Sequence, residues 1–281
     1  MNVTRRRLCA ALALTALPIA GRAESATLTI GLFPNLPAHR LIELYQPLAT
    51  YLAQLLGCQV RLFSARDFKT FYQATRDNQF DLVVTAPHLA WLAMSESGWR
   101  PLVTFSHSVT GVIVVKQGSE ITDPKSCRGK SVAMVDSLAI VSQLGLGYFK
   151  AAGLTANTDY RVSNFRNHAD AALAVMIAKA DCGVVGKLPF QQMVAEVQGK
   201  LQIIGETQSV PSQFVMASSR MSMVLSERVR AALVAFPRAP SGATFIKAQH
   251  SGMMVAADAN ALVPIQPYAL VTRALLSQGG E

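Results

Sequence analysis

Short apolar segments and segments with helical spacing alternate along the first third of the chain. Residues 27–33 alternate apolar and polar side chains and predict a strand, and residues 60–63 and 80–85 predict two more. Between the first two strands, apolar side chains recur at helical spacing up to Gly57, a natural stop because glycine adopts the left-handed cap conformation cheaply. A second helix is expected near residues 69–76, so strand and helix follow one another in strict order.

The same order returns in the middle of the chain. Strands are expected at residues 131–135, 160–165 and 183–185, with helices at 142–152 and 169–180 between them. Such alternation is typical of parallel strands joined by crossover helices, which form doubly wound sheets with ligand sites beyond the carboxyl ends of the strands. We therefore predict an α/β fold of two lobes, each built on a doubly wound, mostly parallel sheet.

Two further strand-like segments, residues 111–116 and 214–217, are placed to carry the chain from one lobe to the other and back. They divide the chain into a first lobe of residues 24–111 and 218–281 and a second lobe of residues 112–217. Strand connections instead of a flexible tether indicate a hinge, with a ligand cleft between the lobes.

The N-terminus has the pattern of a signal peptide. Three arginines, Arg5 to Arg7, precede a short apolar run. In Gly21-Arg22-Ala23, small residues occupy the two positions that a signal peptidase recognises before its cleavage site. We predict cleavage after residue 23, export to the periplasm and no membrane span thereafter, because no later stretch approaches the roughly 20 apolar residues a span needs. The arginines fit a twin-arginine signal as well as an ordinary one, so the export route stays open.

Charge and motifs narrow the class of function. Removal of residues 1–23 lowers the formal net charge from +9 to +5, and no run of lysine and arginine suggests nucleic-acid binding. No Gly-x-Ser-x-Gly elbow and no histidine or acid spacing typical of a metal site occurs. We therefore expect a monomeric binding protein without catalytic activity, cofactor or metal.

Three cysteines, Cys58, Cys127 and Cys182, remain in the predicted mature chain. Exposed thiols tend to pair in an oxidising compartment. Cys127 and Cys182 both stand at the starts of strands that the usual strand order makes neighbours. We predict a disulfide between these two, with Cys58 unpaired.

Several short motifs resemble the phosphate, phosphite and phosphonate-binding family. In order along the chain they are Gly31-x-x-Pro34, Tyr45-x-Pro47-Leu48, Arg66-Asp67-Phe68, Ala86-Pro87, Arg128-Gly129-Lys130 and Asn167-His168-x-x-Ala171. The resemblance covers roughly residues 28–220. It implies a type II periplasmic binding fold that captures a small oxyanion and delivers it to an ABC permease.

The resemblance also implies pocket positions. Phe68 stands where the family usually has tyrosine, and His168 matches a family histidine. The family binds its anion with serine and threonine hydroxyls at the start of a helix. In residues 136–142 of this chain, the only hydroxyl side chains are Ser137 and Ser142. Together with positions expected at strand ends, the predicted ligand-binding residues are Phe68, Thr85, His88, Ser137, Ser142, His168 and Gln213.

Two alternatives use the same fold. A periplasmic sensor would dock its closed, ligand-bound form onto a membrane histidine kinase. A cysteine in its cleft would suit arsenite, because a thiolate prefers soft acceptors. A pyrimidine-precursor synthase family also resembles this fold, although none of its chemistry is visible in the chain.

Overall fold

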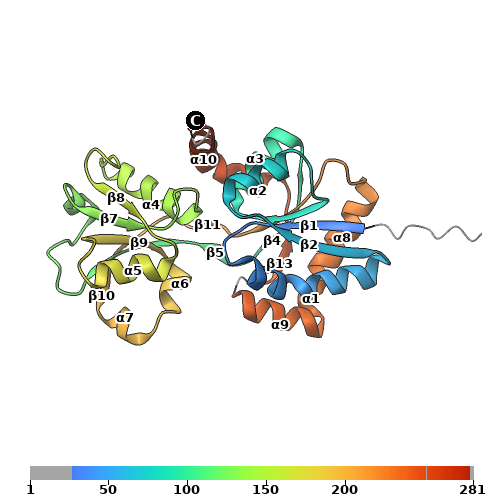
Figure 1. Cartoon of the computed structure of the whole chain (residues 1–281), viewed down its shortest axis with the longest axis horizontal. Coiled ribbons are helices and arrows are strands. Elements are labelled where there is room, and N and C mark those ends of the chain that lie inside the picture. Colours follow the sequence, from blue (N-terminus) through green and yellow to red (C-terminus); the bar gives the residue numbers. More distant parts are fainter. Residues whose placement is uncertain (1–26, 251, 279–281) are drawn as a thin grey trace, which may run out of the picture.

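The computed structural model describes residues 27–250 and 252–278, so the predicted signal peptide at residues 1–23 lies outside the described residues. Two sheets form the cores of two lobes (Figure 1). The sheet of the first lobe has the order β13-β4-β12-β3-β1-β2, with β1 parallel to β2 and β3. The elements of this lobe are β1 (Thr27–Leu32), α1 (Ala38–Leu56), β2 (Gln59–Ser64), α2 (Phe68–Arg76), β3 (Leu82–Thr85), α3 (Pro87–Ser97) and β4 (Arg100–Phe105), then β12 (Phe214–Ala217), α8 (Met223–Ala235), η2 (Phe236–Arg238), α9 (Pro240–Gln249), β13 (Met254–Ala256) and η3 (Ala259–Ile265).

The second lobe repeats the architecture with the strand order β10-β6-β9-β7-β8. Strand β7 is parallel to both β8 and β9, while β6 runs antiparallel beside β9. The elements are β6 (Gly111–Lys116), η1 (Pro124–Cys127), β7 (Ser131–Met134), α4 (Ile140–Ala151), β8 (Arg161–Asn164), α5 (His168–Met176), β9 (Cys182–Gly186), α6 (Lys187–Gln191), α7 (Ala195–Gly199) and β10 (Leu201–Glu206). The predicted two-lobed α/β fold is confirmed, with antiparallel strands added to each parallel core.

The lobes are joined by a two-stranded antiparallel ribbon of β5 (Ser108–Val109) and β11 (Val210–Pro211). A hydrogen bond of 2.7 Å between the hydroxyls of Thr110 and Ser209 fastens it. Strand β6 lies wholly in the second sheet, and β12 lies in the first sheet because it pairs with β3 and β4. The crossings therefore precede the segments expected to make them, and β12 belongs to the first lobe and not to the second as expected.

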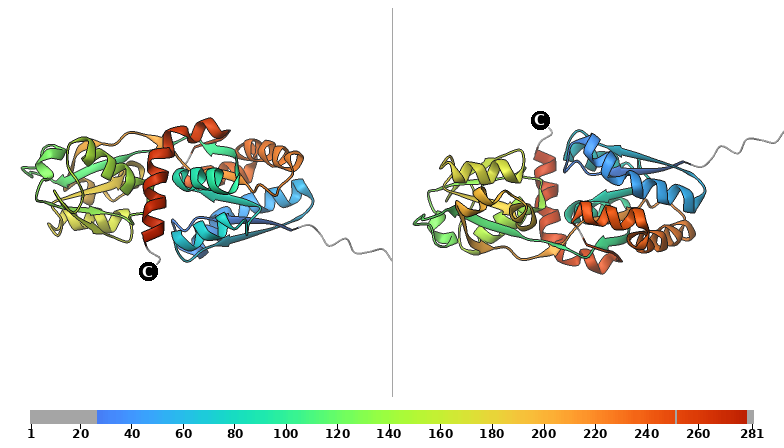
Figure 2. Two further views of the ribbon diagram at one scale, coloured as in Figure 1. Left: turned by 90° about the horizontal axis from the view of Figure 1, so that it is seen from above. Right: turned by 90° about the horizontal axis from the view of Figure 1, so that it is seen from below.

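The last helix, α10 (Gln266–Gln278), does not simply complete the first lobe. It packs against α3 of the first lobe and also against α4 of the second. Figure 2 shows it lying across the junction of the lobes. The hydroxyl of Tyr268 on α10 accepts a hydrogen bond from the Gln208 side chain beside the ribbon. The C-terminal helix therefore contacts both lobes beside the ribbon that joins them.

Local sequence signals account for several helix boundaries. The carboxylate of Asp67 and the amide oxygen of Asn167 accept backbone N–H groups at the starts of α2 and α5. Gly57 ends α1 with φ of 68°, the left-handed conformation that glycine adopts without strain. Helix α5 ends earlier than the predicted residue 180, in a turn where Ala178 has φ of 59°. Among the described residues, no helix has the length and apolarity needed to cross a membrane.

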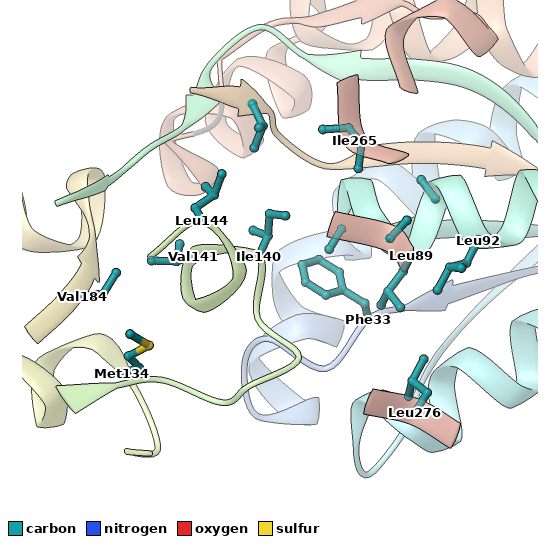
Figure 3. Close-up of a cluster of buried hydrophobic side chains, with 14 of the residues drawn as sticks. Phe33, Leu89, Leu92, Met134, Ile140, Val141, Leu144, Val184, Ile265 and Leu276 are labelled. Carbon is teal, nitrogen blue, oxygen red and sulfur yellow. The ribbon is translucent and has the colours of Figure 1, made fainter. Parts of the chain in front are cut away.

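One cluster of buried apolar side chains runs from the first lobe into the second (Figure 3). It includes Phe33 and Leu89 of the first lobe, Val141 and Leu144 on α4, and Ile265 beside α10. Burial of such side chains contributes about 25 cal/mol for each square ångström removed from water. The two lobes are therefore already in apolar contact on one side of the hinge.

Candidate binding cleft

A cavity of about 610 Å³ lies between the two lobes, beyond the carboxyl ends of β3, β7 and β9. Its walls combine apolar side chains with polar groups from both lobes. Among the described residues that line it are four histidines and one lysine, and none of them is an aspartate or glutamate. A wall with several hydrogen-bond donors and no carboxylate favours the binding of an anion, because it supplies donors without electrostatic repulsion.

Four of the seven predicted pocket residues line this cavity, namely Phe68, His88, His168 and Gln213. The other three do not. Thr85 is buried inside the first sheet, where it faces Phe214 of β12. Its hydroxyl has no hydrogen-bond partner among the described residues.

The two serines before and inside α4 do not line the cavity. The buried Ser142 hydroxyl donates to the carbonyl of Val135 at 3.1 Å. Ser137 is exposed, and its carbonyl accepts a hydrogen bond of 2.5 Å from the Gln143 side chain. The serine hydroxyls that the family pattern places at the start of this helix do not reach the cavity among the described residues. Ala139, Ile140 and Val141 line it instead.

The starts of α3 and α4 present backbone donors to the cavity from opposite lobes. Their N-cap residues are Ala86 and Ala139, which have no side-chain oxygen to bind the free N–H groups of the first turn. Both N-caps line the cavity, whereas the nearby α2 and α5 are capped by their own side chains. The free N–H groups and the positive ends of two helix dipoles therefore converge on one space.

His168, the first residue of α5, is held as a hydrogen-bond donor. Its Nδ1 accepts the backbone N–H of Gly186 at 3.2 Å, so the proton of the neutral ring is on Nε2. Burial lowers the pKa of His168 to about 4, which keeps the ring neutral at ordinary pH. A neutral ring with a fixed Nε2–H can donate to an anion without bringing a charge of its own.

His88, near the start of α3, is fully buried and has a different partner. Its Nε2 lies 2.9 Å from the carbonyl of Leu138 in the second lobe, so the ring donates across the junction. Burial lowers the pKa of His88 to about 4, and Nδ1 has no partner among the described residues. The histidine thus links the lobes and uses its only proton to do so.

Two other polar side chains of the cavity are held by neighbours. The amide oxygen of Gln213 accepts a 2.9 Å hydrogen bond from the Tyr45 hydroxyl, which leaves the amide nitrogen free to donate. The ammonium group of Lys187 lies 2.9 Å from the carboxylate of Glu206, and both side chains are nearly half exposed. Lys187 therefore gives the cavity a cation that is only partly neutralised.

Sequence reasoning missed the part of the wall formed by irregular segments. His107 precedes the ribbon and donates from Nδ1 to the carbonyl of His250 at 2.9 Å. His250 ends α9 in the left-handed conformation, with φ of 52°. These two residues are far apart in the chain, and no spacing in the sequence connects them.

None of the described cysteines lines the cavity, so the thiolate contact that would favour arsenite has no support. Among the described residues, histidine, cysteine and acidic side chains also form no group of three or more that could hold a metal ion.

Comparison with solved structures gives matches over most of the chain, and those described below are under 25% identical, so they show the fold alone. A Xanthomonas citri protein solved with chloride matches at a TM-score of 0.76 and 16% identity, over 90% of this chain and 99% of that one. A binding-protein component of an ABC phosphonate transporter from Pseudomonas aeruginosa has a TM-score of 0.73 and 15% identity, over 90% and 89% of the two chains.

The PhnD1 protein of Prochlorococcus marinus in complex with methylphosphonate is similar at a TM-score of 0.74 and 12% identity, covering 89% of this chain and 98% of that one. These folds confirm the type II periplasmic binding architecture. A family model describing the phosphonate ABC transporter periplasmic substrate-binding protein matches residues 30–262. The resemblance seen in the sequence is thereby confirmed, and this chain is a solute-binding protein that belongs to the phosphonate-binding family of ABC transporter substrate-binding proteins.

Proposed function

We propose that this protein works in the periplasm, where it captures a small organic oxyanion of the phosphonate type in the cleft between its lobes and delivers it to an ABC permease. The observation that carries the proposal is the pair of helix starts without side-chain caps, α3 and α4, which come from opposite lobes and line one cavity. An anion held by both helices favours the closed arrangement of the lobes over the open one.

The cavity walls support an organic ligand. The ring centroids of Phe33 and Phe68 lie 6.3 Å apart on one side, and Ile140 and Val141 face the cavity from the second lobe. Apolar walls favour an oxyanion with a small apolar substituent over inorganic phosphate, because the substituent leaves water on binding. The described residues of the lining include no carboxylate that would pair with a ligand ammonium group, which disfavours aminophosphonates.

A thermal-shift series on the mature protein tests the ligand class. We expect methylphosphonate and phenylphosphonate to raise the melting temperature more than phosphate, phosphite or sulfate, since a ligand stabilises the folded state according to its concentration relative to its dissociation constant. Aminoethylphosphonate and arsenite should give the smallest shifts. A series in which no phosphonate raises the melting temperature at millimolar concentration contradicts the proposal.

The role in uptake is tested separately. In this proposal the protein is a monomer that docks its closed form onto a permease, so deletion of the gene should abolish uptake of the ligand that binds in vitro. Loss of a transcriptional response to the ligand with normal uptake would instead favour the sensor that partners a histidine kinase. Gel filtration of the loaded protein checks the monomer.

A further inference from the structure

Two cysteines of the second lobe lie in contact at the end of the sheet opposite the cleft, where β9 begins. The sulfur atoms of Cys127 and Cys182 are 3.2 Å apart, and both side chains are fully buried. Cys127 ends the short helix η1, and Cys182 begins β9. A covalent bond requires the sulfurs to approach to about 2.05 Å.

The surrounding backbone fixes both cysteines where they stand. The register of the parallel pair β7 and β9 places Cys182 opposite Val132. The N–H of Lys130 donates to the carbonyl of Cys127 at 3.0 Å, and the N–H of Asp181 donates to the carbonyl of Ser131 at 3.1 Å. The two sulfurs therefore face one another because of the fold itself, and only a small side-chain adjustment separates the thiol pair from a disulfide.

We propose that Cys127 and Cys182 form a structural disulfide that ties η1 to β9 and closes a large loop of the second lobe. The two thiols lose two protons and two electrons as the sulfur–sulfur bond forms. A thiol–disulfide oxidoreductase in its disulfide form accepts them through a mixed disulfide and leaves as a dithiol.

The bond forms while the lobe folds. In the folded protein no solvent reaches either side chain, and the hydrogen bond with Cys127 together with burial raises the pKa of Cys182. A buried, protonated thiol exchanges slowly, because the thiolate is the attacking species. Cys58 packs against the core of the first lobe and has no cysteine near it among the described residues, so it stays reduced.

The oxidising compartment rests on the proposed periplasmic role, so the experiment avoids cells. Denatured, reduced mature protein is refolded in a glutathione redox buffer, blocked with an alkylating agent and digested without reduction. We expect a single cross-linked peptide pair containing Cys127 and Cys182, with Cys58 alkylated. Recovery of all three cysteines as alkylated peptides, or a cross-link that contains Cys58, overturns the proposal without affecting the ligand-binding role.

A stability comparison supplies the second readout. Reduction of the refolded protein should lower the melting temperature by about 5 to 15 °C, because the closed loop is long and the disulfide restricts the unfolded chain. The double variant C127A/C182A should lose this response to the reductant, whereas the matched control Cys58→Ala should keep it. An equal melting temperature before and after reduction of the wild-type protein contradicts a structural bond.

Discussion

His88 and His168 stand at the starts of helices in opposite lobes and line the same cavity, yet they use their protons differently. Burial lowers the pKa of each to about 4, so both are neutral. His88 donates a hydrogen bond from Nε2 to the carbonyl of Leu138 in the other lobe, whereas the Gly186 N–H occupies Nδ1 of His168 and leaves its proton on Nε2, which has no partner among the described residues. The partner of the second ring nitrogen, and not the residue type, therefore decides whether a cleft histidine links the lobes or keeps an Nε2–H available to the cavity.

The largest expected effect is a loss of folding stability at acid pH, to which both histidines contribute. In the unfolded chain a histidine binds a proton near pH 6.5, whereas His88 and His168 in the folded chain stay neutral down to about pH 4. The unfolded state therefore binds more protons between these values, and the free energy of unfolding falls as the pH is lowered from 6.5 to 4. Each unit between the two pKa values contributes about 1.4 kcal/mol per histidine.

Denaturant titrations from pH 7 to pH 4 measure this slope. His88→Asn and His168→Asn should each make the slope shallower, while His39→Asn should not, because His39 is exposed and outside the cavity. If either cavity variant keeps the wild-type slope, that histidine is not neutral and buried in solution.

The second effect separates the two histidines. Replacing His168 with alanine should weaken binding of methylphosphonate about 10- to 100-fold, because a hydrogen bond to a charged group is lost. Titration calorimetry measures the affinity, and His39→Ala is the matched control. An unchanged dissociation constant for His168→Ala would remove this residue from the binding site.

His88 should act on the arrangement of the lobes instead. Because His88→Asn removes a hydrogen bond between the lobes, the ligand-free protein should become more open, and affinity should fall only about twofold to tenfold. Small-angle scattering should show a larger radius of gyration for the free variant and an equal radius once ligand saturates it. A free variant as compact as the wild type contradicts the linking role.

The smallest effect belongs to Lys187, which is nearly half exposed and paired with Glu206. Lys187→Met should weaken binding less than about fivefold, because the attraction between an exposed ammonium group and an anion contributes only about 0 to 1 kcal/mol. The difference should disappear at high salt, which screens exposed charges. Glu206→Gln is the matched control and should strengthen binding slightly. A loss for Lys187→Met that persists at high salt would place the ammonium group directly on the ligand.

The sequence predicts the repeated strand and helix order well, because apolar side chains recur at strand and helix spacing and some boundaries carry a local signal such as the Asp67 cap or the Gly57 stop. The cleft is less predictable. His168 and Phe68 follow from family motifs, but the Ser142 hydroxyl is turned to the carbonyl of Val135, just after β7, and no local pattern in the sequence reveals that contact. The approach of His107 to His250 depends on how the ends of α9 and β4 meet, which only the assembled lobe determines.

The apolar contact between α4 and the first lobe bears on the speed of binding as well as its strength. Because Val141 and Leu144 already share a buried cluster with Phe33, the free protein spends little reorganisation energy when it takes up a ligand. We expect that contact to loosen when a ligand enters or leaves, which would slow association and prolong residence. Slow release of this kind would suit the capture of a scarce ligand that we propose for this protein.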